Sequence, residues 1–350
     1  MKTIDAYRLG IRNYPGHWGF RNELSYEYIA AGKYEEGLQE GLEAARLRPD
    51  VEPPYRRQLD AYMCLNRLSE AGQLREKLRM SDFGGARIHQ RFLELAYIQD
   101  DPREIDRETQ WFAGKPEEYI GWALQAAYRN VLGQRNESHR LFERAAESAR
   151  RLGLGGVATD FDEADAQDDA LLGNCQTARR LGRPALALAL CGDSAPAEKL
   201  AAETSKLFPN GTIWNAVELP EIRSAIALSR NEPAKGVELL ASASPYELAY
   251  LSAIYLRGLA YLRLNKGTEA TSEFQKIVDH KGASWGALWE RPYWGQYYSL
   301  SYLGMARAFA HAGDSAKARK AFQDFFELWK DSDPDIPILK QATAEYAKLQ

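Results

Sequence analysis

Apolar residues recur every three to four positions over most of the chain, in runs that end at Gly, Asn or Asp. This spacing is typical of amphipathic helices, which place such residues on one face. In the stretch 255–278, for example, Gly258 and Tyr261 precede a polar break at Asn265, and Phe274 follows it. The pattern predicts a helical hairpin, in which small residues let the two helices approach and aromatic residues fill the gap to the next hairpin.

The break residues recur at a nearly constant interval. Gly32, Asn66, Asp100 and Gly133 follow one another at steps of 34, 34 and 33 residues, and later breaks stand at Gly192, Asn231, Asn265 and Gly313. A period of about 34 residues with a helix–turn–helix pattern is typical of the tetratricopeptide repeat, or TPR. The sequence therefore predicts an all-α protein: a right-handed α-solenoid of about eight TPR-like hairpins with a C-terminal capping helix at 336–349.

Three intervals of the predicted array are irregular, one of them the step of 39 residues from Gly192 to Asn231. The 59 residues from Gly133 to Gly192 are fewer than two periods, which predicts a compressed or fused helix after Gly173. The 48 residues from Asn265 to Gly313 include an insertion of about fourteen. We therefore expect N-terminal repeats at 1–151, an irregular repeat at 152–192, C-terminal repeats at 193–330 with an aromatic insertion near 283–298, and the capping segment at 331–350.

Composition limits the classes of partner. Hydrophobic residues make up 45% of the chain and charged residues 27%, which is ordinary for a folded protein. The net charge is -4, and Lys and Arg are spread along the chain, so we expect no binding of nucleic acid. Apolar runs are too short to span a membrane. The expected partner is a protein or peptide, or a second copy of this chain.

The sequence shows little that favours catalysis or metal binding. Cys64, Cys175 and Cys191 are too scattered for a disulfide framework or a zinc site, so we expect buried thiols. The acidic residues of 160–169 lack the calcium-loop pattern, and we expect them near a helix N-terminus and on its solvent face. No kinase motif set, nucleophile elbow or metal spacing of histidines is present. We therefore predict no catalytic residue, no metal and no cofactor.

Several stretches carry a resemblance to a known family. They include "PYELAYLSAIYLRGLAYLRL", "EFQKIVDHKG", "LALALCGDSAPAEKLAAETSKLFPNGT" and "LGMARAFAHAGDSAKARKAFQDFFELWKDSDPDIPILKQATAEYAKLQ". The chain resembles the C-terminal TPR region of bacterial eukaryotic-like serine/threonine kinases and of related winged-helix regulators. The resemblance implies a regulatory repeat module. The chain departs from the pattern of that family at the compressed repeat and at the aromatic insertion. It includes no kinase domain, so the resemblance does not imply kinase activity.

In a TPR array the first helix of each hairpin lines an inner groove suited to a peptide. Counting back from each break predicts the polar and charged residues that face this groove. The predicted partner-binding residues are Asn22, Tyr26, Arg56, Asp60, Arg87, Gln90, Glu94, Asn130, Tyr255, Arg263 and Arg307.

One known TPR mode holds a peptide's C-terminal carboxylate with basic and amide side chains of three successive units. Arg87 and Arg91 fit the third unit of that mode. Asn22 and Tyr26 stand where its first unit has Lys and Asn, so the resemblance to this mode is partial.

The aromatic insertion is a second candidate interaction site. Trp285, Trp289, Tyr293 and Trp294 are interrupted by Pro292 and Gly295, which break a helix and favour a loop. Trp and Tyr are enriched at interface hot spots, so the loop would offer anchors for a partner or for self-association. The alternative is that these side chains pack along a hairpin edge.

Three functions follow from these features. The first is a non-catalytic protein-interaction scaffold or regulatory TPR module of a bacterial signalling protein. The second is a small-ligand-sensing domain of a transcriptional regulator, which requires a closed apolar pocket. The third is an unrecognised helical enzyme. The expected location is the cytoplasm; an extracytoplasmic location is the alternative, because in the resembled kinases a membrane span can separate the kinase from the repeats.

Overall fold

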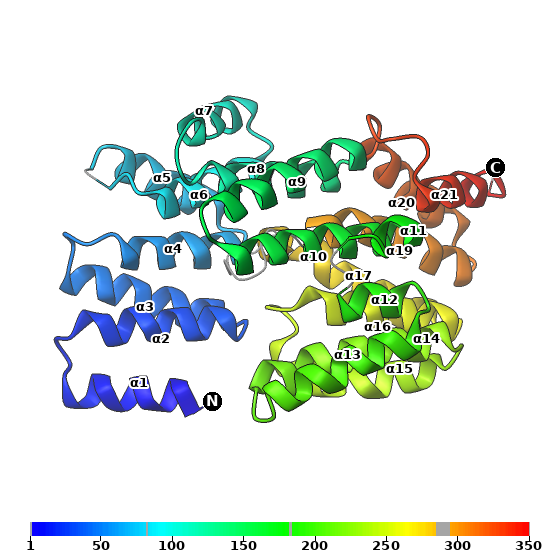
Figure 1. The fold of residues 1–350 in the computed structure, drawn as a ribbon, viewed down its shortest axis with the longest axis horizontal. Helices are drawn as coiled ribbons and strands as arrows, with labels where there is room; N and C mark the ends of the chain where they lie inside the picture. Colours follow the sequence, from blue (N-terminus) through cyan, green and yellow to red (C-terminus); the bar gives the residue numbers. More distant parts are fainter. Residues whose placement is uncertain (1, 82, 182–183, 285–294, 350) are drawn as a thin grey trace. The chain divides into compact units, whose positions relative to one another are not determined.

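A computed structural model describes residues 2–81, 83–181, 184–284 and 295–349, and these residues form helices and turns without any strand (Figure 1). The helices are α1 (Lys2–Asn13), α2 (Trp18–Ala30), α3 (Tyr34–Leu47), α4 (Pro53–Cys64), α5 (Leu68–Arg79), α6 (Ala86–Gln99), α7 (Pro102–Phe112), α8 (Glu118–Val131), α9 (Arg135–Arg151), α10 (Gly155–Leu172), α11 (Cys175–Ala178), α12 (Ala185–Leu190), α13 (Ser194–Leu207), α14 (Leu219–Ser229), α15 (Pro233–Leu239), α16 (Leu251–Arg263), α17 (Gly267–Asp279), α18 (Lys281–Ser284), α19 (Gly295–His311), α20 (Ser315–Leu328) and α21 (Pro337–Ala347). A π-helical turn (Trp214–Glu218) precedes α14, and a 3₁₀ segment (Leu240–Tyr246) follows α15.

The predicted break residues all have the left-handed backbone conformation that ends a helix. Their φ angles are positive, from 51° at Asp100 to 82° at Gly192. After each of them, the next N–H donates to the carbonyl five residues earlier, as from Lys266 to Tyr261 at 2.9 Å. Gly and Asn tolerate this conformation better than other residues do, which explains why they recur there. The predicted positions of the turns are confirmed.

Small residues set the close contacts between hairpin helices, as predicted. A Cβ at Gly258 would lie 2.7 Å from the ring of Phe274, and one at Gly304 would lie 2.6 Å from the same ring. Phe274 is fully buried. Three helices, α16, α17 and α19, therefore meet at one aromatic side chain because two of them have glycine there.

The chain forms two compact units. Unit 1 comprises Met1–Leu124 and His280–Pro292, and unit 2 comprises Gln125–Asp279 and Tyr293–Gln350. The two units are defined by contacts in space, whereas the division expected from the sequence is defined by the repeat interval. The division expected from the sequence stays a prediction. The capping helix is present as α21, which packs against α20 in unit 2.

The compressed repeat differs from the expected fused helix. The chain forms two short helices, α11 and α12, because Pro184 takes an extended conformation before α12. This reversal brings Cys175 and Cys191 together as a disulfide, with their Cα atoms 5.5 Å apart. The prediction of thiols at these two positions is therefore wrong, since the chain reverses within 16 residues. Cys64 is a buried thiol, as predicted.

The expectation that the acidic run lies on a solvent face is also wrong for three of its members. Asp165, Asp168 and Asp169 are buried on α10, each at most 3% exposed. Arg135, from α9, donates to Asp169 at 2.9 Å and also pairs with Asp165. Arg135, which lies 30 residues before Asp165, thus compensates the burial of these carboxylates. The local spacing of the acidic residues does not reveal this distant partner.

Candidate functional site

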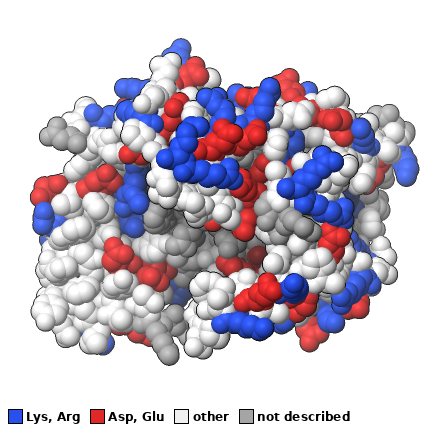
Figure 2. Space-filling view, viewed as in Figure 1, with Lys and Arg blue, Asp and Glu red and all other residues white. Residues whose placement is uncertain are grey.

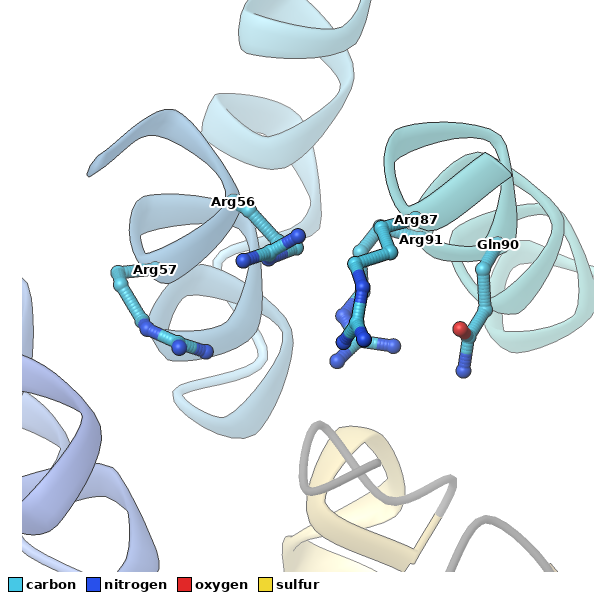
Figure 3. Close-up of a pocket in the computed structure, with 5 residues that line it drawn as sticks. All are labelled: Arg56, Arg57, Arg87, Gln90 and Arg91. Atoms are coloured by element: carbon cyan, nitrogen blue, oxygen red, sulfur yellow. The ribbon is translucent and has the colours of Figure 1, made fainter. Parts of the chain in front are cut away.

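An arginine-lined cavity lies between α4 and α6 in unit 1 (Figure 3). Two prolines begin α4, where their fixed φ and missing N–H favour the first helical turn. The cavity has a volume of about 30 Å³ and is lined by Arg56, Arg57, Arg87, Gln90 and Arg91. Arg87 and Arg91 are one helical turn apart, so both project from one face of α6 toward the side chain of Arg56 (Figure 3).

Two buried carboxylates hold the inner arginine of this cavity. Arg91 is 2% exposed, pairs with Asp60 of α4 and lies 3.1 Å from Glu94. Gln90 donates to Glu94 at 3.0 Å. Burial raises the pKa of Glu94 to about 7, although Arg91 opposes the shift. Glu94 is therefore poised to lose or gain its charge near neutral pH.

Arg56 lies at the outer side of this cavity and is also affected by burial. Burial, followed by the charge of Arg57, lowers the pKa of Arg56 to about 10. Arg56 forms an ion pair with Glu52 at 3.2 Å. Glu52, Asp60 and Glu94 pair with Arg56, Arg57 and Arg91, and of these carboxylates Glu94 titrates near pH 7. Four of the five side chains that line the cavity are arginines.

Arg57 leaves a hydrogen-bond donor unused. Its Nε is buried without a hydrogen-bond partner, and the side chain is 9% exposed. The guanidinium lies over the ring of Tyr26 at 4.6 Å and contacts Asp60 only at 3.3 Å. A buried donor without an acceptor is costly, so an anionic or carbonyl oxygen at this position would be favoured.

Several predicted groove residues of unit 1 meet at this cavity. Arg56, Arg87 and Gln90 line it, Asp60 and Glu94 neutralise Arg91, and Tyr26 supports Arg57. Asn22 is buried on α2, donates to Glu23 at 2.8 Å and has an unpaired Oδ1. Their role in binding stays a prediction. Arg57 was missed because it is adjacent to Arg56, and neighbouring helical positions usually face different sides.

The predicted groove residues of unit 2 take part in internal contacts. Asn130 donates to Asp168, and Arg263 donates to the carbonyl of Leu228. Arg307 forms a two-point pair with Glu345 of α21, at 2.8 and 3.1 Å.

Tyr255 is part of the core of unit 2. Its ring packs edge-on against Phe274, and burial raises its pKa to about 12. These contacts hold the hairpins together, and binding by the four predicted residues of unit 2 is untested.

The aromatic candidates Trp285, Trp289, Tyr293 and Trp294 lie outside the described residues. Their predicted interaction role is untested. Helix α18, which directly precedes them in sequence, belongs to unit 1 and packs on α4.

The surface charge is mixed. On the face shown in Figure 2, basic and acidic residues are interspersed. Across the residues with described structure, no group of three or more His, Cys, Asp or Glu is placed to hold a metal ion. Within the same ranges, no helix has the length and apolar character needed to cross a bilayer.

Comparison with solved structures identifies the fold. A chain of the APC/C hetero-tetramer Cut9-Hcn1 is 11% identical with a TM-score of 0.50, over 97% of this chain and 58% of that chain. The P58(IPK) TPR domain is 11% identical with a TM-score of 0.27, over 99% and 92% of the two chains. Human IFIT1, crystallised as a dimer with m7Gppp-AAAA, is 18% identical with a TM-score of 0.36, over 95% and 76%.

The matching structures are TPR-repeat proteins, and the predicted fold class, an all-helical TPR-like solenoid, is confirmed. At this level of identity the similarity shows the fold alone. This chain spans 58% of the length of the matched Cut9-Hcn1 chain. Neither a protein-family model nor a curated protein sequence matches it.

Proposed function

We propose that this protein is a non-catalytic interaction scaffold of the TPR class and that the arginine-lined cavity of unit 1 binds an acidic segment of a partner protein. The observation that carries this proposal is the buried, unpartnered Nε of Arg57 in a cavity lined by four arginines. Arginine is well suited to this task because its planar guanidinium forms paired, charge-assisted hydrogen bonds with carboxylates.

The size of the cavity favours a carboxylate. One water needs about 10–15 Å³ of accessible space, so a cavity of about 30 Å³ accepts roughly two water-sized atoms. The two oxygens of a Glu or Asp side chain match this size. The TPR groove then holds the peptide backbone on either side, as expected for an array whose first helices line an inner face.

In this proposal the chain is a regulatory module of a bacterial signalling protein and works in the cytoplasm. The similarity of its repeats to those of bacterial kinases and winged-helix regulators supports that context. Protein or peptide recognition, without catalysis or a cofactor, is the activity that the polar groove supports.

The proposal is tested with a fluorescein-labelled oligoglutamate peptide, with an oligoglutamine peptide of the same length as the control ligand. We expect saturable anisotropy with oligoglutamate that weakens as salt is raised. The Arg56→Gln, Arg87→Gln variant should lose about tenfold or more in affinity, since a charge-assisted hydrogen bond contributes roughly 1.5–3 kcal/mol. Arg103→Gln removes an exposed arginine from α7 and should bind as the wild type does. Equal affinity for both peptides would refute the proposal.

A small-ligand sensor is a second candidate, favoured by a larger cavity in unit 1. This cavity of about 500 Å³ lies among α1, α2 and α3 and is lined by both charged and apolar side chains: Asp5, Arg8, Ile11, Arg12, Leu24, Tyr28 and Glu40. Its volume is within the range of ligand pockets, about 300–1,000 Å³. Thermal-shift screening with small metabolites tests this candidate: stabilisation that Leu24→Trp abolishes would support it, and no stabilisation by any compound would count against it.

A further inference from the structure

Helix α18 is a short segment of unit 1, although α17, which precedes it in the sequence, belongs to unit 2. It comprises Lys281–Ser284 and packs on α4. Gly282, Ala283 and Ser284 are buried. A segment of four residues cannot be a stable helix by itself, so its conformation depends on these contacts.

Gly282 is the centre of this contact. Its N–H donates to Oδ1 of Asn66 at 2.9 Å. A Cβ at this position would lie 1.8 Å from the carbonyl oxygen of Met63, near the C-terminal end of α4. Because that obstacle is backbone, any other residue at 282 would force the segment away from α4.

A second contact ties the segment to α6. Lys281 Nζ lies 3.0 Å from Oδ2 of Asp100. Asn66 and Asp100 are the left-handed residues that end α4 and α6. The ammonium group of a lysine near the C-terminal end of α6 also interacts favourably with the negative pole of the helix dipole. The segment therefore contacts the ends of the same two helices whose side chains form the arginine-lined cavity.

The contact with α4 is within reach of a peptide bound in that cavity. Arg56, Asp60 and Met63 follow one another at helical spacings of four and three residues, which places them along one stripe of α4. Met63 lies seven residues after Arg56, about 10 Å along the helix axis. Three residues of an extended peptide cover about the same distance.

We infer that α18 is an internal competitor: it packs on the C-terminal end of α4, and a partner peptide bound in the arginine-lined cavity must displace it to extend along that helix. This inference rests on the proposed function. It predicts that the free protein binds acidic peptides more weakly than a variant in which the segment is detached, because part of the intrinsic affinity is used to displace it.

Two variants detach the segment by different means. Gly282→Val places side-chain atoms against the Met63 carbonyl, and Gly84→Val is its control because a Cβ at Gly84 meets nothing within 4 Å. Asn66→Gly removes the acceptor for the Gly282 N–H while keeping a residue that tolerates positive φ. Its control is Asn265→Gly, the same turn position in a repeat of unit 2.

Two independent readouts are needed. Hydrogen exchange of residues 281–284 reports detachment, and anisotropy with the oligoglutamate peptide reports affinity; circular dichroism confirms that each variant is folded. In both variants we expect faster hydrogen exchange of residues 281–284 and about tenfold tighter binding of the peptide. This factor applies if the wild type has α18 detached about a tenth of the time. The two controls should match the wild type in both readouts.

The possible results separate the inference from the proposed function. Faster exchange with unchanged affinity, while Arg56→Gln, Arg87→Gln still loses binding, would overturn the inference and leave the proposed function intact. Unchanged exchange in both variants would also overturn it. Absence of peptide binding by the wild type and by both detached variants would overturn the proposed function together with the inference.

Discussion

Arg91 of α6 forms a buried ion pair with Asp60 of α4, and neither side chain is more than 2% exposed. The pair joins two successive hairpins of unit 1 at the inner end of the arginine-lined cavity. Both residues come from the middle of a first helix, so the charges that shape the candidate site also contribute to repeat packing.

Removing one partner of this pair should be strongly destabilising. Asp60→Ala removes a buried carboxylate that pairs with Arg91 and that Arg57 also contacts. Breaking a buried ion pair costs roughly 3–5 kcal/mol. Urea unfolding of Asp60→Ala should show that loss, whereas Asp50→Ala, which breaks an exposed, solvent-screened pair with Arg48, should change stability far less. Equal effects of the two substitutions would contradict the burial of the Arg91 pair.

Glu94 should make stability fall as pH rises. Its folded-state pKa of about 7 is above the ordinary value of 4.5, so between these values the folded protein binds a proton that the unfolded chain has released. The resulting stabilisation is complete below pH 4.5 and lost above about pH 7, and its full size is about 3 kcal/mol.

Urea unfolding at pH 5 and pH 8 measures this effect. We expect the wild type to lose more stability between these values than Glu94→Gln does, by roughly 2–3 kcal/mol. His139, whose pKa is raised mainly by its hydrogen bond with Asp165, titrates in both proteins, so its contribution cancels in the difference. Parallel pH profiles would mean that Glu94 titrates normally.

The disulfide should stabilise unit 2. Cys175 and Cys191 close a loop of 16 residues, and a loop of this length restricts the unfolded chain by about 3 kcal/mol. Cys175→Ser, Cys191→Ser should lower the unfolding free energy by roughly 2–3 kcal/mol. A thiol reductant should lower the stability of the wild type but leave the double variant unchanged; sensitivity of the double variant to reductant would assign the effect elsewhere.

The sequence predicts features that repeat and misses those that join distant residues. The left-handed turns were predictable because Gly and Asn favour positive φ, and the same backbone geometry recurs at Asn66 and Asn265. The spacing of Arg87 and Arg91 likewise places both on one face of α6. A repeat period therefore gives the elements and much of the candidate site.

Other features depend on contacts that no local pattern encodes. The cation for Asp169 is Arg135, on another helix, and the acceptor for the Gly282 N–H is Asn66, 216 residues away. Cys175 and Cys191 pair because the compressed repeat folds back on itself, which spacing alone does not show. These are properties of tertiary packing, so they required the structure.

The packing around Phe274 provides a test of the hairpin contacts in unit 2. A Cβ at Gly304 would lie 2.6 Å from the Phe274 ring, so Gly304→Ala should force the ring or the helix to shift and cost roughly 1–3 kcal/mol. Gly156→Ala is the matched control, since Gly156 lies in α10 with nothing within 4 Å of its Cβ position. Gly156→Ala should be neutral or stabilising, because alanine is the better helix former by about 1 kcal/mol.

The measurement is urea unfolding of both single variants and of the double variant Gly304→Ala, Phe274→Leu, in which the smaller side chain at 274 should relieve the clash. If Gly304→Ala lowered stability as much with Leu at 274 as with Phe, the contact with the Phe274 ring would not be the cause of the loss.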